Sequence, residues 1–229
     1  MRKRLFHIVK GRSALTGEKW VVLLHGILRT PRSMASIEKE LIKHGYRVIN
    51  FGYPSRSESI TVIAKRLHRE IQKKIPRNVQ ELNFVTHSLG TIVVRYYLSH
   101  FRVKRLGRFV MIAPPNKGSE WARILDRVPL YRWFLGVAGQ EIRHFPKSLP
   151  PILPSPPCEF GVIAGGRGNS SGINPFIQGD DDGTILVAET KLEGMKDFIV
   201  IRGQHSMLLF QKRVIDNVIS FLGTGKFLF

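Results

Sequence analysis

The sequence is short of three things: cysteine, acidic side chains and long apolar runs. Its single cysteine, Cys158, excludes an intramolecular disulfide framework and any zinc site built from several cysteines. The apolar runs fall far short of the about 20 residues that a membrane-spanning helix needs. Asp and Glu together number 17 against 36 Lys and Arg, which gives a formal net charge of +19. This balance excludes an acidic disordered protein and favours an anionic partner.

Apolar and aromatic residues are present in the amounts of a folded domain. Of the 229 residues 43% are hydrophobic, with 14 Phe, 5 Tyr and 3 Trp, enough apolar surface to offset the entropy of ordering a core. The basic residues 1–4 resemble the start of a signal peptide, but His7 and Lys10 interrupt the apolar residues that follow. We therefore expect one domain over residues 1–229, in a soluble cytoplasmic protein that can contact a membrane surface peripherally.

Short apolar runs alternate with stretches of helical periodicity along the chain. Helical stretches are expected to begin at Pro31, Ile60 and Ser88, and a last helix is expected over residues 206–222. The expected strands are residues 20–24, 46–51, 82–85, 109–113, 160–164 and 198–201. This alternation predicts an α/β fold with a mostly parallel central sheet flanked by helices. Residues 116–157 interrupt the pattern with helix-like pieces and a proline-rich end, which predicts a cap or lid inserted above the sheet.

The strongest local signal surrounds Ser88, between an expected strand and an expected helix. A serine on such a sharp turn presents its hydroxyl at the carboxyl edge of the sheet and can act as a nucleophile. Small neighbours two residues away let the turn close: Gly90 meets this need, and Thr86 meets it less comfortably. The alternative is an ordinary helix start with Ser88 as the N-cap.

The first expected strand ends in His25, Gly26 and Ile27, at the same edge of the sheet. There the backbone N–H of Ile27 can join that of Leu89 as an oxyanion hole. Loss of one such donor costs on the order of 2.7–4 kcal/mol in the transition state. The alternative is a simple turn after a strand.

A serine nucleophile needs a base, and the base needs a carboxylate to fix its tautomer. Three consecutive aspartates, residues 180–182, lie in a glycine-flanked loop, and His205 follows a late strand. The order of serine, acid and histidine is the one expected for this type of sheet. His87 adjoins the serine, so its side chain is expected to point away from the hydroxyl. The remaining candidates, His7, His44, His68, His100 and His144, are expected at the surface or at helix ends.

Five segments in this order resemble the α/β-hydrolase superfamily, and within it the bacterial lipase and esterase branch. They are residues 22–27 (VLLHGI), 85–90 (VTHSLG), 113–119 (APPNKGS), 182–185 (DGTI) and 203–205 (GQH). The resemblance covers about residues 20–222 and implies that Asp182 is the triad acid, with Asp181 as the second choice. It implies no metal and no organic cofactor. Thr86 departs from the usual glycine, which other members also replace by a small residue.

These observations predict a serine hydrolase of carboxylic esters, acting through Ser88, Asp182 and His205 on a small ester or a lipid. Trp121, Trp133 and Phe134 of the expected cap are candidates to line an acyl pocket. The same triad would serve a thioesterase, an acyltransferase or an amidase.

A rival interpretation is a non-catalytic basic protein of the same fold that binds anionic membrane or nucleic acid. Basic residues recur along helices instead of clustering with aromatics, so nucleic acid is not favoured. Residues 2–4 and 65–74 are the candidates for contact with anionic lipid. The glycine-rich residues 165–168 lack the spacing and the lysine of a phosphate loop. The aspartates at 180–182 lack the further carboxylates of a cation site.

Overall fold

A single sheet of six strands forms the centre of the molecule, in the order β2-β1-β3-β4-β5-β6. The computed structural model describes residues 17–125, 136–141 and 149–228. All five strand pairings are parallel. The strands are β1 (Lys19–Leu24), β2 (Arg47–Phe51), β3 (Glu81–His87), β4 (Leu106–Ile112), β5 (Phe160–Gly166) and β6 (Asp197–Arg202). The α/β architecture predicted from the sequence is therefore confirmed.

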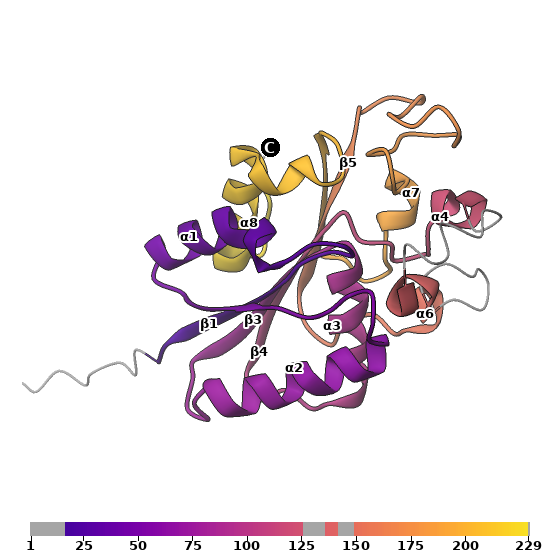
Figure 1. Ribbon diagram of the computed structural model, residues 1–229. Coiled ribbons are helices and arrows are strands. Elements are labelled where there is room, and N and C mark those ends of the chain that lie inside the picture. Colours follow the sequence, from indigo (N-terminus) through magenta and orange to yellow (C-terminus); the bar gives the residue numbers. More distant parts are fainter. Residues whose placement is uncertain (1–16, 126–135, 142–148, 229) are drawn as a thin grey trace, which may run out of the picture.

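Different helices cover the two faces of this sheet (Figure 1). Val22 and Leu24 of β1 pack with α2 (Ile60–Lys74) and α3 (Leu89–His100), whereas Val21 and Leu23 pack with α1 (Ala35–Lys43) and α8 (Lys212–Thr224). Successive side chains of a strand point to opposite faces. A strand covered on both faces therefore needs the continuous apolar run that β1 has.

Three helical predictions need correction. The expected helix over residues 206–222 is two elements, the 3₁₀ helix η2 (Met207–Phe210) and α8, because Gln211 between them adopts an extended backbone. The helical spacing of Ile37, Leu41 and Ile42 predicts one buried face on α1, but the Ile42 side chain is 56% exposed. Ile37 and Leu41 are one helical turn apart, and Ile42 lies about 100° further around the helix. The helix expected from Pro31 likewise begins as a 3₁₀ turn, η1 (Pro31–Met34).

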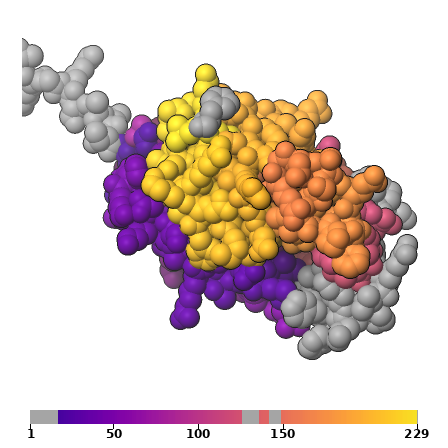
Figure 2. All heavy atoms as spheres, turned by 90° about the horizontal axis from the view of Figure 1, so that it is seen from above, coloured from indigo at the N-terminus to yellow at the C-terminus, as the bar shows by residue number. Residues whose placement is uncertain are grey.

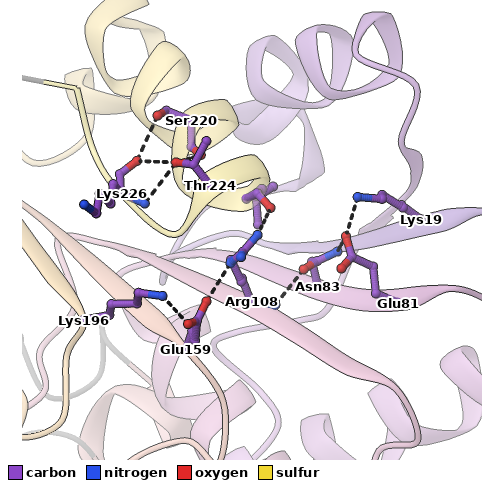
Figure 3. Close-up of polar contacts among 10 residues, drawn as sticks. Lys19, Glu81, Asn83, Arg108, Glu159, Lys196, Ser220, Thr224 and Lys226 are labelled. Carbon is purple, nitrogen blue, oxygen red and sulfur yellow. Dashed lines mark hydrogen bonds and ion pairs between the residues drawn. The ribbon is translucent and has the colours of Figure 1, made fainter.

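Polar side chains tie the amino ends of the strands together (Figure 3). Asn83 accepts a hydrogen bond from the backbone N–H of Arg108 on β4 at 2.6 Å and donates to the carbonyl of Trp20 on β1 at 3.2 Å. Arg108 pairs with Glu159 at 2.8 Å and donates to the carbonyl of Leu222 on α8. This end of the sheet lies opposite the carboxyl edge, so the network stabilises the fold without occupying that edge.

The segment 116–157 contributes two short helices where the structure describes it, α4 (Glu120–Leu125) and α6 (Leu149–Ile152). Arg95 of α3 is 1% exposed and donates to the backbone carbonyls of Leu153 and Pro154, which fixes the end of this segment to the sheet layer. The interpretation of the segment as a cap stays a prediction. Among the described residues, no helix has both the length and the apolar character needed to cross a bilayer.

Candidate active site

Ser88 lies at the junction of β3 and α3, in a backbone conformation that residues with a side chain rarely adopt. Its φ is 52° and its ψ is −123°, and its N–H donates to the carbonyl of Ile112 on β4 at 2.9 Å. Strain of this kind persists where the surrounding structure imposes it. Gly90, two residues further on, packs tightly against β1, because a Cβ on that residue would lie 2.7 Å from the carbonyl oxygen of Leu24. Ser88 therefore occupies a tight strand-to-helix turn.

Thr86, at the position where the resemblance predicts a glycine, is fully buried. Its hydroxyl oxygen lies 2.7 Å from that of Thr91, on the first turn of α3. The hydrogen bond between the two hydroxyls satisfies both groups away from water. The turn thus accommodates the threonine by giving its hydroxyl a partner.

His205 and Asp182 are joined by a hydrogen bond of 2.7 Å between Nδ1 and Oδ2. The Asp182 side chain is fully buried, and its other oxygen accepts the N–H groups of Thr184 at 3.0 Å and Ile185 at 2.8 Å. The backbone N–H of His205 also donates to the carbonyl of Asp182. Two backbone N–H groups therefore hold one oxygen of this carboxylate while the other accepts from the imidazole, and the backbone bond from His205 to Asp182 joins the two loops.

Asp181 faces away from His205. Its carboxylate accepts backbone N–H groups from Ile173, Asn174 and Gly183, at distances of 2.6–3.3 Å. Of the two aspartates considered for the triad, Asp182 binds the histidine, whereas Asp181 binds backbone N–H groups and so stabilises its loop.

Ser88 and His205 are connected through contacts of Gly26 and His87. A Cβ on Gly26 would lie 2.8 Å from Nδ1 of His87 and 3.1 Å from Cβ of Ser88. The ring of His87 lies 4.7 Å, centroid to centroid, from that of His205. The Ser88 hydroxyl makes no hydrogen bond to any described residue, and its side chain is 5% exposed. The serine and the histidine thus belong to one cluster at the carboxyl edge of the sheet.

Two backbone N–H groups beside Ser88 are free of acceptors in the described part of the chain, those of Leu89 and Ile27. Leu89 is the first residue of α3, where a helix leaves its N–H groups unpaired. The turn that holds Ile27 is fixed by a bond of 3.0 Å from the Leu28 N–H to the Ser55 hydroxyl. Tyr53 also fixes it, by donating its hydroxyl to the carbonyl of His25.

His87 was not expected in the site. From the sequence its side chain is expected only to point away from the Ser88 hydroxyl; in the structure the ring is buried and packs against that of His205. Burial, with smaller effects of His205, Arg29 and His25, holds the pKa of His87 well below its usual range. The signal in the sequence was its place at the end of the strand that carries the nucleophile candidate.

The glycine-rich residues 165–168 bind a side chain of the protein itself. The carboxylate of Asp180 accepts the N–H of Arg167 at 2.7 Å and that of Gly168 at 2.9 Å. In Figure 2 the segment around residues 165–185 (orange) lies beside the C-terminal segment (yellow). The anion that these backbone N–H groups bind is therefore the carboxylate of Asp180.

Of the residues expected to line an acyl pocket, Trp121 lies on α4, where its ring stacks on that of Phe176 at 5.8 Å. Trp133 and Phe134 lie outside the described residues.

Cys158, the single cysteine, packs against the core beside α3, and burial raises the pKa of its thiol to about 12. A thiol in that state is no nucleophile at neutral pH.

Part of the chain matches a known protein family. Residues 16–121 match the model of a family described as "Putative serine esterase (DUF676)". This range includes Ile27, Ser88 and Leu89 and ends before Asp182 and His205. No curated protein matches the sequence.

Solved structures of bacterial lipases and esterases have the same fold at low sequence identity. The mature lipase BlEst2 of Bacillus licheniformis aligns over 90% of this chain and 90% of its own, with a TM-score of 0.62 and 15% identity. The esterase EaEST of Exiguobacterium antarcticum aligns over 91% and 93%, with a TM-score of 0.60 and 14% identity. The phospholipase PlaB of Legionella pneumophila aligns over 76% of this chain and 45% of its own, with a TM-score of 0.58 and 17% identity. The chain therefore has the α/β-hydrolase fold, and the comparisons support an ester hydrolase at the level of the class.

Proposed function

We propose that this protein is a serine hydrolase of carboxylic esters in which Ser88 is the nucleophile, His205 the base and Asp182 the acid that orients the base. The observation that carries the proposal is the Asp182–His205 hydrogen bond of 2.7 Å beside a strained serine turn. A carboxylate accepts only, so Nδ1 of His205 carries the proton of this bond and Nε2 keeps a lone pair. That lone pair is what a serine hydroxyl needs in order to lose its proton.

Acylation would begin with transfer of the Ser88 proton to Nε2 of His205 as Oγ bonds to the ester carbon. The carbonyl π electrons move to oxygen and form a tetrahedral oxyanion. When this intermediate collapses, the bond to the alcohol oxygen breaks, and the imidazolium gives its proton to the leaving alcohol. Water then adds to the acyl-serine with His205 again as base, and the acid product leaves. Asp182 stabilises the imidazolium in both halves of the cycle.

The oxyanion would be held by the N–H groups of Ile27 and Leu89. Both lack an acceptor among the described residues, and the N-terminus of α3 adds its partial positive charge. The Ser88 hydroxyl lacks a hydrogen bond to the described residues, as is common in enzymes without substrate, where catalytic hydrogen bonds are often long.

The acyl group would extend toward the segment 116–157, where Trp121, Trp133 and Phe134 are proposed to line its pocket. The stacking of Trp121 on Phe176 supports an apolar surface at this place. If the proposal holds, Trp133→Ala and Phe134→Ala shift the preferred acyl length. Unchanged preference and rate would place the acyl pocket elsewhere.

Labelling with a fluorophosphonate probe tests the whole proposal, because the probe reacts only with an activated serine. We expect wild-type protein to be labelled and Ser88→Ala and His205→Ala to remain unlabelled, with each variant checked for native circular dichroism. Absence of labelling in folded wild-type protein would overturn the proposal. A panel of esters, thioesters and amides sharing one acyl group then identifies the bond that is cleaved.

A further inference from the structure

Arg29 lies in the turn after β1, two residues beyond the proposed oxyanion donor Ile27. Its Nη2 donates to the hydroxyl of Ser206 at 2.5 Å, and Ser206 directly follows His205. The guanidinium therefore reaches from the loop that holds Ile27 to the loop that holds His205. A side chain that links these two loops can contact a substrate group that extends out of the site between them.

The positive charge of Arg29 is not neutralised by any described carboxylate. Asp182, the acid bound to His205, uses both of its oxygens, one for His205 and the other for Thr184 and Ile185. The bond to Ser206 uses one N–H, and a guanidinium has five. Arg29 is exposed, so the remaining donors are open to a ligand.

Two further properties suit the pair of side chains to an anion. The Ser206 hydroxyl accepts from Arg29, which leaves its own proton free to donate to a ligand. The charge of Arg29 also acts on the buried cluster, since it is one of the causes that lower the pKa of His87. The cation is therefore close enough to act on the buried cluster while it remains exposed to solvent.

We propose that Arg29 and Ser206 form an anion subsite at the mouth of the active site, so that the preferred substrates are esters carrying a carboxylate or phosphate group near the scissile bond. This inference rests on the proposed function. The planar guanidinium pairs with either group through two parallel hydrogen bonds, which fixes the ester relative to Ser88. A simple brace between the two loops would instead affect all substrates alike.

Three acetyl esters with similar leaving groups test the subsite. They are 4-acetoxybenzoate, 4-acetoxyphenyl phosphate and the neutral methyl 4-acetoxybenzoate. We expect wild-type kcat/KM to be higher for at least one anionic ester than for the neutral one. In Arg29→Gln that advantage should shrink by about tenfold or more, the loss typical of a hydrogen bond to a charged group. The first two esters distinguish recognition of carboxylate from recognition of phosphate.

Arg32→Gln is the matched control. Arg32 is an exposed cation on η1, three residues further along the chain, and its removal changes the net charge by the same amount. If general attraction by the net charge of +19 causes the preference, Arg32→Gln and Arg29→Gln reduce it equally. The proposal requires Arg32→Gln to keep the wild-type ratio and Arg29→Lys to retain part of it.

The outcomes separate the subsite from the activity itself. Wild-type protein without preference for an anionic ester, or Arg29→Gln with all three rates lowered in proportion, overturns the subsite. In both cases Ser88 would still be labelled by the fluorophosphonate probe. Absence of that labelling in the folded wild type would overturn the proposed function instead.

Discussion

The imidazole of His87 lies against that of His205, with the ring centroids 4.7 Å apart and the planes inclined by 47°. Nε2 of His87 is 3.1 Å from the backbone carbonyl of His205, which accepts only, so Nε2 carries a proton. In the neutral ring Nδ1 is then unprotonated, and it is buried without a hydrogen-bond partner among the described residues. His87 therefore supports both the backbone and the ring of the proposed base while remaining uncharged.

Replacement of His87 should change how stability depends on pH. The native pKa lies well below its usual range, chiefly because of burial, whereas the unfolded imidazole titrates near 6.5. Below about pH 6.5 the unfolded chain takes up a proton that the native state does not, so the free energy of unfolding falls by up to about 1.4 kcal/mol per pH unit. We expect His87→Gln to lose less stability than wild type between pH 7.5 and pH 5, as measured by urea unfolding. Equal losses would contradict a neutral, buried His87.

Glu189 should change the pH dependence of stability in the opposite direction to His87, because its contribution to the free energy of unfolding falls as pH rises. Burial, with some repulsion from Glu120 and Asp182, raises its pKa to about 7, although the N–H groups of Leu186 and Glu120 favour the ionised form. The native carboxyl thus keeps a proton that the unfolded chain has lost above about pH 4.3. This contribution is fully present below that pH and is lost as pH rises through 7.

We therefore expect Glu189→Gln to gain stability relative to wild type as pH rises from 5 to 8, by roughly 1–3 kcal/mol. Parallel thermal or urea unfolding at the two pH values measures the change. Glu193→Gln, which replaces an exposed carboxylate four residues further along the chain, controls for the loss of a negative charge. A constant difference between Glu189→Gln and wild type would be evidence against the raised pKa.

Substitution of Asp182 should mainly lower activity, whereas substitution of Asp181 should mainly lower stability. In Asp182→Asn the amide can no longer hold the imidazolium of His205, and we expect kcat on the best ester to fall by on the order of 10⁴-fold with the fold retained. In Asp181→Asn three backbone N–H groups lose a charged acceptor, and we expect a lower melting temperature as the main effect. A larger loss of kcat in Asp181→Asn than in Asp182→Asn would reverse the assignment.

Gly90 should not tolerate a side chain, for reasons of space. A Cβ there would lie 2.7 Å from the carbonyl oxygen of Leu24 and 2.8 Å from that of His25, and backbone atoms have little freedom to move. We expect Gly90→Ala to be destabilised by several kcal/mol or to lose fluorophosphonate labelling, because the start of α3 must shift away from β1. Gly223 on α8 has nothing within 4 Å of its Cβ position. Gly223→Ala should therefore be neutral or stabilised by about 0.5–1 kcal/mol. Native stability and labelling in Gly90→Ala would show that the turn is less tightly packed than this geometry requires.

Much of the framework follows from the sequence, because hydrophobic period and turn residues act locally. The apolar run of residues 20–24 predicted β1, which has side chains buried on both faces of the sheet. The spacing of Ile60, Ile63, Leu67 and Ile71 predicted α2, and all four are buried. The same reasoning failed at Gln211, where packing of Leu208 and Leu209 into the core ends one helix before the next begins.

The roles of the three aspartates at residues 180–182 could not be predicted from neighbouring residues in the sequence. Three consecutive aspartates are equivalent by composition, and the resemblance only ranked them. Their carboxylates point to different partners: Asp180 to the backbone after β5, Asp181 to residues 173–174 and Asp182 to His205. Each direction depends on strands that are distant in the sequence and adjacent in the sheet.

The sequence by itself determined a parallel α/β sheet, the serine on its strand-to-helix turn, and the order of serine, acid and histidine. Periodicity and the small residues beside Ser88 carry that information, since they act between near neighbours in the chain. Only the tertiary structure decided that Asp182 binds His205, that His87 supports His205 and that Arg29 reaches Ser206. These contacts span 23, 118 and 177 residues. Such pairs meet only because parallel strands bring their carboxyl ends to one edge of the sheet.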